Sequence, residues 1–125
     1  MEPNYEYKYD DTNGILFKIY YNNISFETLK ESWEHAFKNN VIPEGTKKFV
    51  LDYRETDIVM SADDVPKILE FYKKHIDIFQ NAKVAIIIEE PDQSIIPMLF
   101  HIEEKDYITK PFHTVKSAVE WLIFE

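Results

Sequence analysis

The stretch Lys83-Val84-Ala85-Ile86-Ile87-Ile88-Glu89 decides the fold, because it is almost wholly apolar, β-branched and bounded by charged residues. A run of this kind is typical of a strand that is covered on both faces. It therefore predicts the central strand of a sheet that has helices on either side.

Two helices and one strand are predicted upstream of this central strand. Residues 26–37 carry apolar side chains at helical spacing, and residues 48–52 form a second short buried strand. The next helix begins between Ser61 and Asp64. Ser61 with Asp64 three residues later resembles a capping arrangement, but Pro66, which suits only a first helical turn, favours a cap nearer Asp63.

Downstream of the central strand, a third helix is predicted from Pro91 to Phe100. Residues 107–111 then form a short strand, and Thr114 precedes a terminal helix. Helices that separate strands imply right-handed crossovers and a largely parallel sheet.

The N-terminal stretch predicts a β-hairpin. Residues 5–9 alternate aromatic and charged side chains, and Asn13-Gly14 precedes a second apolar run over residues 15–21. Both residues of an Asn-Gly pair tolerate the positive φ of a tight two-residue turn. The full order is β-β-α-β-α-β-α-β-α. It predicts one α/β domain over residues 1–125, with an N-terminal hairpin and helices packed on a mixed, mostly parallel sheet.

The composition of the 125-residue chain excludes several classes of function. The chain has no cysteine, which excludes disulfides, thiolate metal sites and cysteine nucleophiles and favours a reducing compartment such as the cytoplasm. A net charge of −9 repels phosphate, so no nucleic-acid partner is expected. No secretory signal is visible and no apolar run reaches the ~20 residues that span a bilayer, so no membrane insertion is expected.

The sequence contains no motif for catalysis or for cofactor or metal binding. The two glycines, Gly14 and Gly45, form no phosphate-binding loop, and no serine lies in a nucleophile elbow. The four histidines lack the i, i+4 spacing that places two imidazoles on one metal ion. We therefore expect a protein that is not an enzyme and that needs no cofactor.

Several residues resemble the receiver family of phosphoacceptor domains. These are the acidic pair Asp10-Asp11, Asp52 after an apolar strand, and Lys110 before a proline. In a receiver the acidic pair leads into a helix, whereas here it leads into a turn and another strand. Glu89 also stands where a hydroxyl is expected, and its carboxylate would oppose a phosphoryl group. An aspartate phosphoacceptor is therefore the least favoured hypothesis.

A second resemblance covers about residues 12–125. The order of elements, the stretch Phe49-Val50-Leu51-Asp52-Tyr53-Arg54 and the closing Ala118-Val119-Glu120-Trp121-Leu122 are similar to the SpoIIAA-like branch of the STAS superfamily. These are small bacterial domains similar to anti-sigma-factor antagonists, with a fold related to CRAL-TRIO lipid-transfer domains. The resemblance implies a SpoIIAA-like fold and a non-catalytic protein-interaction or regulatory domain.

Three residues are the candidates for a ligand- or partner-binding site, namely Asp52, Arg54 and Ser61. Ligand sites of open α/β sheets lie at strand ends, where Asp52 is expected, although a carboxylate there also pairs readily with a cation such as Arg54. In regulatory STAS domains, a serine or threonine that begins the following helix is phosphorylated, and Ser61 is the closest positional match. The alternative for Ser61 is a helix cap.

Two kinds of partner remain open. The resemblance implies a protein partner, or self-association through the hairpin edge or an apolar helix face. The likeness to CRAL-TRIO domains leaves a carrier of a small lipophilic ligand as the second hypothesis. Tyrosines such as Tyr20, Tyr21, Tyr53 and Tyr72 would then line an apolar groove instead of packing only into the core.

Overall fold

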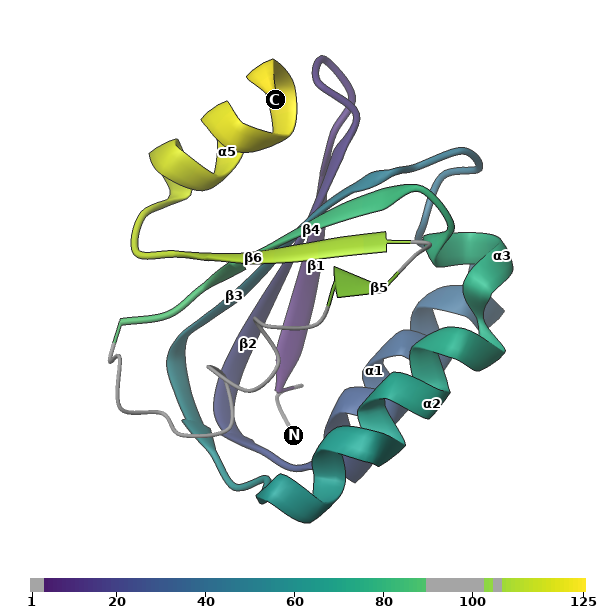
Figure 1. Ribbon diagram of the computed structural model, residues 1–125, viewed down its shortest axis with the longest axis vertical. Helices are drawn as coiled ribbons and strands as arrows, with labels where there is room; N and C mark the ends of the chain where they lie inside the picture. The colour runs from purple at the N-terminus through teal and green to yellow at the C-terminus, as the bar shows by residue number, and fades with distance from the viewer. Residues whose placement is uncertain (1–3, 90–102, 105–106) are drawn as a thin grey trace.

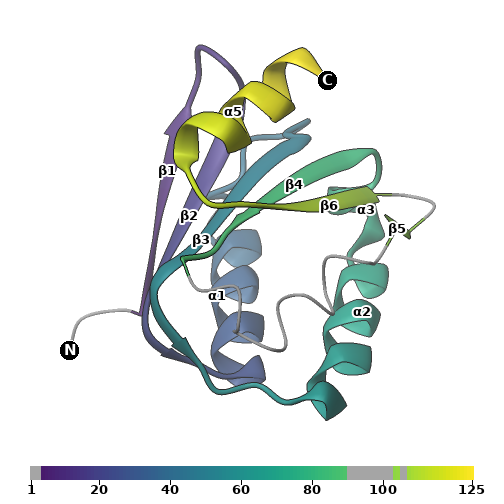
Figure 2. The same ribbon diagram turned by 60° about the vertical axis from the view of Figure 1, so that its left-hand side comes forward.

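The computed structural model describes residues 4–89, 103–104 and 107–125. The described residues form one six-stranded sheet in the order β1-β2-β3-β4-β6-β5, with α1, α2 and α3 on one face and α5 on the other (Figures 1 and 2). The strands are β1 (Tyr5–Asp10), β2 (Ile15–Ile24), β3 (Lys48–Ile58), β4 (Ala82–Ile87), β5 (Glu103–Glu104) and β6 (Tyr107–Phe112). The helices are α1 (Phe26–Lys38), α2 (Val65–Lys74), α3 (Ile76–Phe79) and α5 (Val115–Phe124), and a 3₁₀ turn, η1 (Ala62–Asp64), leads into α2.

The strand directions confirm the predicted α/β fold with a mostly parallel sheet and an N-terminal hairpin. Strands β2, β3, β4 and β6 are parallel, whereas β1 pairs antiparallel with β2 and β5 pairs antiparallel with β6. The two-residue strand β5 was not predicted, because two glutamates carry no strand pattern. The helix predicted over residues 91–100 lies outside the described residues.

Strand β4 lies inside the sheet, as its sequence predicted, and its side chains alternate between two hydrophobic cores. Val84 and Ile86 belong to the larger core beneath α1, α2 and α3. Ala85 and Ile87 belong to the smaller core beneath α5. The near-continuous apolar run therefore reflects burial on both faces of the sheet.

Helices α1 and α5 begin at short polar side chains. The Ser25 hydroxyl accepts the N–H of Thr28 (3.2 Å) at the start of α1, and the Thr114 hydroxyl accepts the N–H of Ser117 (3.1 Å) at the start of α5. Each bond satisfies one of the N–H groups that a helix leaves unpaired at its first turn. None of the described helices is long and apolar enough to cross a membrane.

The hairpin turn is looser than predicted. Only Gly14 has a positive φ (67°), and Asn13 does not, so the loop spans residues 11–14 and is no two-residue turn. The Asp10 carboxylate accepts the N–H groups of Thr12 (3.0 Å) and Asn13 (3.4 Å). The acidic residue at the end of β1 therefore organises the turn, in keeping with the role of aspartate in Asx turns.

Strand β3 continues to Ile58, whereas the sequence predicted a strand that ends at Asp52. The cause is β2, whose second half pairs with the second half of β3 as far as Ile24. The pairing register shifts by one residue between Ile19 and Tyr21, which leaves an extra residue on β3 as a bulge. Because β4 pairs with β3 only up to Asp52, β2 and β3 extend beyond the rest of the sheet as a two-stranded arm.

The start of α2 falls within the predicted range, because Ser61 is the N-cap of the 3₁₀ turn η1 and Asp64, one residue after Asp63, is the N-cap of α2. The Ser61 N–H donates to the Asp64 carboxylate (3.0 Å), and the Asp64 N–H donates to the Ser61 carbonyl (3.0 Å). Turn η1 passes directly into α2, with Pro66 in its first turn, where a missing N–H leaves no helical bond unmade.

Candidate ligand-binding site

The predicted site residues Asp52 and Arg54 form an ion pair on the α5 side of the sheet. Arg54 Nε donates to Asp52 Oδ1 (3.0 Å) and Nη2 donates to Oδ2 (2.7 Å), while the Arg54 backbone N–H also donates to Oδ1 (3.0 Å). This hydrogen bonding raises the pKa of the Arg54 guanidinium. Both carboxylate oxygens are therefore occupied by a neighbour two residues away, which is the arrangement expected of a structural pair.

Ser61 lies apart from this pair. Strand β3 runs six residues past Asp52, and about 20 Å of extended chain separates Asp52 from the end of the strand. Ser61 follows that end and is exposed at the N-cap of η1, beside Asp63 and Asp64. The three predicted residues therefore do not form one site, and the position of Ser61 fits a helix cap.

The residues of the receiver resemblance are also separated. Asp10 lies at the hairpin turn, and the strand register aligns it with Lys48 at the start of β3. Lys48 and Asp52 are four residues apart on β3, which corresponds to about 13 Å. Lys110 lies on β6, two strands away from β3, and its amino group is 5.9 Å from the centroid of the Trp121 ring. These residues therefore do not assemble around Asp52.

The histidines in the described ranges lie in separate packing contacts. The His35 ring meets Tyr5 edge-on at 6.0 Å, His75 packs 4.7 Å from Phe37, and His113 Nδ1 lies 3.2 Å from a backbone carbonyl. Within the same ranges no group of three or more histidine, aspartate or glutamate side chains is placed to hold a metal ion.

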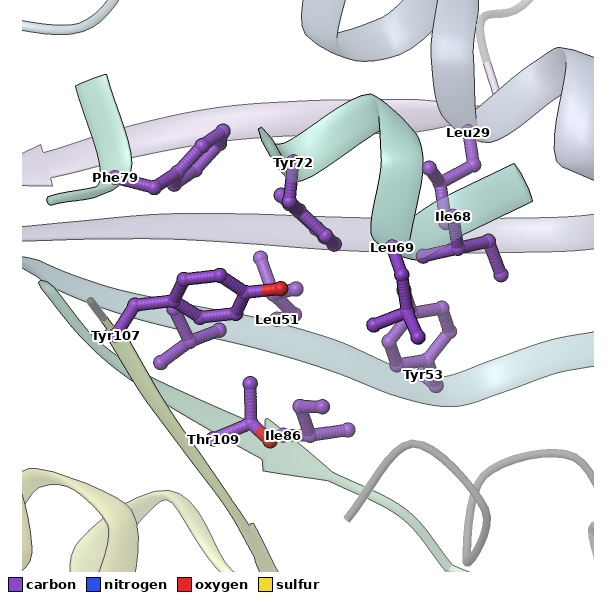
Figure 3. Close-up of a pocket in the computed structure, with 11 residues that line it drawn as sticks. Leu29, Leu51, Tyr53, Ile68, Leu69, Tyr72, Phe79, Ile86, Tyr107 and Thr109 are labelled. Carbon is purple, nitrogen blue, oxygen red and sulfur yellow. The ribbon is translucent and has the colours of Figure 1, made fainter. Parts of the chain in front are cut away.

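A cavity lies on the opposite face of the sheet from Asp52, between the sheet and α2 (Figure 3). The free space in the cavity is far smaller than the about 300–1,000 Å³ of typical small-molecule sites. Only about 20 Å³ admits the centre of a water-sized sphere, which is room for about one or two waters, so the side chains nearly close it. The lining residues are Leu29, Leu51, Tyr53, Ile68, Leu69, Tyr72, Phe79, Val84, Ile86, Tyr107 and Thr109.

The polar groups on this cavity are hydroxyls. They come from Tyr53 on β3, Tyr72 on α2, and Tyr107 and Thr109 on β6, and Figure 3 shows the Tyr107 side chain extending into the space below α2. Burial raises the pKa of the Tyr53 hydroxyl, so this group stays protonated at neutral pH. The cavity is thus apolar, with a few neutral groups that form hydrogen bonds.

Behind one wall of the cavity, a fully buried lysine lies in a box of aromatic rings. Lys18, on β2, donates a hydrogen bond to the Ser32 hydroxyl, and its amino group lies 3.6 Å from the ring centroid of Trp33, 4.7 Å from Tyr20 and 5.3 Å from Tyr7. It forms no ion pair within the part of the chain that the structure describes. Burial lowers the pKa of Lys18 well below its usual range. We call these five residues the Lys18 box.

The Lys18 box and the cavity are joined by ring contacts. Tyr20 stacks on Tyr53 with centroids 4.6 Å apart, and Trp33 meets Tyr72 edge-on at 6.3 Å. The Tyr20 hydroxyl and the Trp33 indole N–H are buried without a hydrogen-bond partner among the described residues. Ser32 and Tyr53 lie near the hydroxyl and Tyr72 lies near the indole, but none of them meets the geometry of a hydrogen bond.

The sequence indicated part of this region. It named Tyr20, Tyr53 and Tyr72 as possible lining residues, and of these Tyr53 and Tyr72 line the cavity while Tyr20 stacks behind it. It missed Lys18 and Ser32. The available signal was the period of two along β2, which places Lys18 on the same face as its buried neighbours at positions 16 and 20.

The sheet order, the N-terminal hairpin and the helices on both faces define a SpoIIAA-like α/β fold. A similar solved structure is that of an uncharacterised protein of the DUF3478 family with a SpoIIAA-like fold, from Shewanella loihica PV-4. The likeness covers 94% of this chain and 91% of that chain, with a TM-score of 0.63 and 18% sequence identity, and it confirms the predicted fold. No protein-family model matches the chain, and no curated protein matches it.

Proposed function

We propose that this domain binds a small, largely apolar molecule in the cavity between the sheet and α2, without catalysing a reaction on it. One observation carries the proposal, namely the lining of the cavity, to which the described residues contribute apolar side chains and, as polar side-chain groups, tyrosine and threonine hydroxyls alone. Apolar walls with a few placed polar groups are the usual form of a small-molecule site. The non-catalytic role is taken from the sequence, which contains no catalytic motif.

The narrowness of the cavity limits the affinity that we expect. Each buried methylene contributes about 0.8 kcal/mol, so an eight-carbon chain contributes about 6 kcal/mol. Moving side chains apart and ordering the ligand offset part of this gain. We therefore expect a dissociation constant in the micromolar range or weaker, and a ligand that is slender or flat.

Filling the cavity tests the proposal. Leu69 is half-buried on α2 and lines the cavity, so Leu69→Trp should occupy the space and weaken binding of decan-1-ol at least about tenfold. The matched control is Ile108→Trp, which adds the same ring at a position that is 46% exposed on β6 and should leave binding unchanged. Binding is measured by NMR titration, with far-UV circular dichroism to establish that each variant is folded. Failure of the wild type to bind, or equal binding by Leu69→Trp, would refute the proposal.

A second candidate function is the protein-interaction or regulatory domain that the sequence favoured. It is supported by a surface groove between α1 and α2 that suits an acidic amphipathic helix, because three lysines and one glutamate line it and give a local positive charge in a chain of net charge −9. The residues of this groove are Phe26, Lys30, Lys67, Glu70, Phe71 and Lys74. A synthetic acidic amphipathic peptide should bind the wild type and lose affinity for the Lys30→Glu, Lys74→Glu double variant. Equal affinity for the two proteins would remove this candidate.

The setting of either function remains a prediction from the sequence. We place the protein in the cytoplasm because the chain has no cysteine, and in a bacterium because the SpoIIAA-like domains that it resembles are bacterial. Self-association through the β1 edge is likewise part of the proposal, and the molar mass in solution, from light scattering, tests it.

A further inference from the structure

We infer that the Lys18 box is the polar end of the cavity and that it recognises the carboxylate of an otherwise apolar ligand. The inference rests on the proposed binding function and specifies its ligand class, an amphiphilic monocarboxylate. It starts from the hydrogen-bonding groups that β2 and α1 enclose between them.

The Lys18 box holds more hydrogen-bond donors than acceptors. An amino group has several N–H donors, and an indole nitrogen only donates. Lys18 uses one donor on the Ser32 hydroxyl, which is itself engaged in donating to the Leu29 carbonyl (2.7 Å). The Tyr20 hydroxyl and the Trp33 indole N–H have no partner among the described residues. A buried polar group without a partner is costly, and a ligand oxygen that accepts these bonds would remove that cost.

The Lys18 box also lacks a negative charge. As an ammonium ion, Lys18 would be buried with no ion pair among the described residues, and the rings of Trp33 and Tyr20 would offset only part of the desolvation cost. A carboxylate supplies both a countercharge and acceptor oxygens. An alcohol or a hydrocarbon of the same length supplies no charge. The arrangement therefore favours a carboxylate over other polar ends of an apolar ligand.

The distance from the cavity to the Lys18 box is short. The Lys18 amino group lies 4.7 Å from the Tyr20 ring, which stacks at 4.6 Å on Tyr53, a residue of the cavity wall (Figure 3). Leu29, another wall residue, precedes Ser32 by three positions on α1. A ligand whose chain fills the cavity reaches the amino group when the stacked Tyr53 and Tyr20 rings, which lie between the cavity and Lys18, move aside. The ion pair then forms beneath the rings, away from water.

A matched pair of ligands tests the inference. Decanoate and decan-1-ol have the same chain length and differ in the group that meets the Lys18 box. The wild type should bind decanoate at least about tenfold more tightly than the alcohol. Lys18→Met should abolish this preference and keep the affinity for the alcohol. The control Lys8→Met changes an exposed lysine of β1 and should behave as the wild type.

Two further measurements keep the test decisive. Calorimetry of decanoate binding in buffers of different ionisation enthalpy should show proton uptake by the wild type and none by Lys18→Met. Should Lys18→Met fail to fold, Tyr20→Phe removes one donor while it keeps the ring, and it should weaken decanoate binding about three- to tenfold without affecting the alcohol. Equal binding of both ligands by the wild type, or an unchanged preference in the variants, overturns the inference and leaves the proposed function intact. Binding of neither ligand overturns both.

Discussion

Replacing Lys18 by methionine should raise the free energy of unfolding of the ligand-free protein by about 1–3 kcal/mol at neutral pH. Methionine is flexible and close to the lysine stem in length, so it keeps the packing against Trp33 and Tyr20. The substitution removes the amino group, which is fully buried and forms no ion pair with the described residues.

The magnitude follows from the contacts of the amino group. Burying an unpaired charge costs several kcal/mol, whether the group stays charged or is forced to lose its proton. Two contacts offset part of this cost. They are one hydrogen bond to Ser32, which contributes about 1 kcal/mol, and the cation–π contact with Trp33, which contributes about 1–2 kcal/mol. In the variant, Ser32 keeps its bond to the Leu29 carbonyl, so its hydroxyl retains a partner.

The gain in the free energy of unfolding of Lys18→Met over the wild type should depend on pH. Burial lowers the pKa of Lys18 in the folded state, so between that pKa and the usual value of 10.5 the unfolded chain carries a proton that the folded protein lacks. The stability of the wild type therefore rises with pH in this window, by up to about 1.4 kcal/mol per pH unit. Lys18→Met lacks this slope, so its advantage over the wild type should shrink as the pH increases toward 10.5.

Urea denaturation of the wild type and Lys18→Met at several pH values measures both effects. Lys8→Met is the matched control, since that side chain is 69% exposed, and it should change stability by less than about 0.5 kcal/mol. A Lys18→Met protein that is less stable than the wild type at neutral pH would contradict the reasoning. So would a difference between the two proteins that stays constant with pH.

Four further substitutions test other features of the fold. Gly14→Ala should cost about 1 kcal/mol, because its φ of 67° strains any side chain, and an unchanged urea midpoint would argue against that strain. Asp64→Ala should lower the melting temperature more than Ser61→Ala, because the cap uses the Asp64 carboxylate and the Ser61 backbone N–H. That bond lowers the pKa of Asp64. The difference in melting temperature between the two variants should therefore be present above pH 3.8, the usual pKa of aspartate, and be lost as the pH falls through the lowered pKa. Equal melting temperatures of the two variants at neutral pH would contradict the role of the Asp64 carboxylate in the cap. Asp52→Asn should lower the free energy of unfolding by about 1 kcal/mol, because it weakens the pair with Arg54. Acetyl phosphate should label the wild type and Asp52→Asn equally. Label that is lost only in the variant would make Asp52 a phosphoacceptor.

The sheet was predictable because its signals are local. The apolar run that became β4 indicates burial on both faces, and helical spacing on either side of it implies parallel strands. The end of β3 was not predictable in this way. Glu55 and Asp57 have low strand preference, and they extend β3 only because β2 continues beside them after the bulge.

The candidate site was less predictable than the fold. The alternation along β2 places Lys18 on the inner face of the sheet. Lysine is so seldom buried, however, that a prediction from the sequence assigns it to the surface. The cavity depends on how α2 packs over the sheet, which no local pattern encodes. Asp52 and Arg54 drew attention by their place after an apolar run, yet the structure has them paired with each other on the opposite face.

The two tryptophans lie in different cores, so each side of the sheet carries its own fluorophore. Trp33 belongs to the core beneath α1, α2 and α3, and Trp121 belongs to the core beneath α5. Replacing either one by phenylalanine leaves a single emission signal from one side. Because β3 and β4 contribute side chains to both cores, coincident unfolding curves from the two variants would mean that the sheet couples its two helical layers into one cooperative unit.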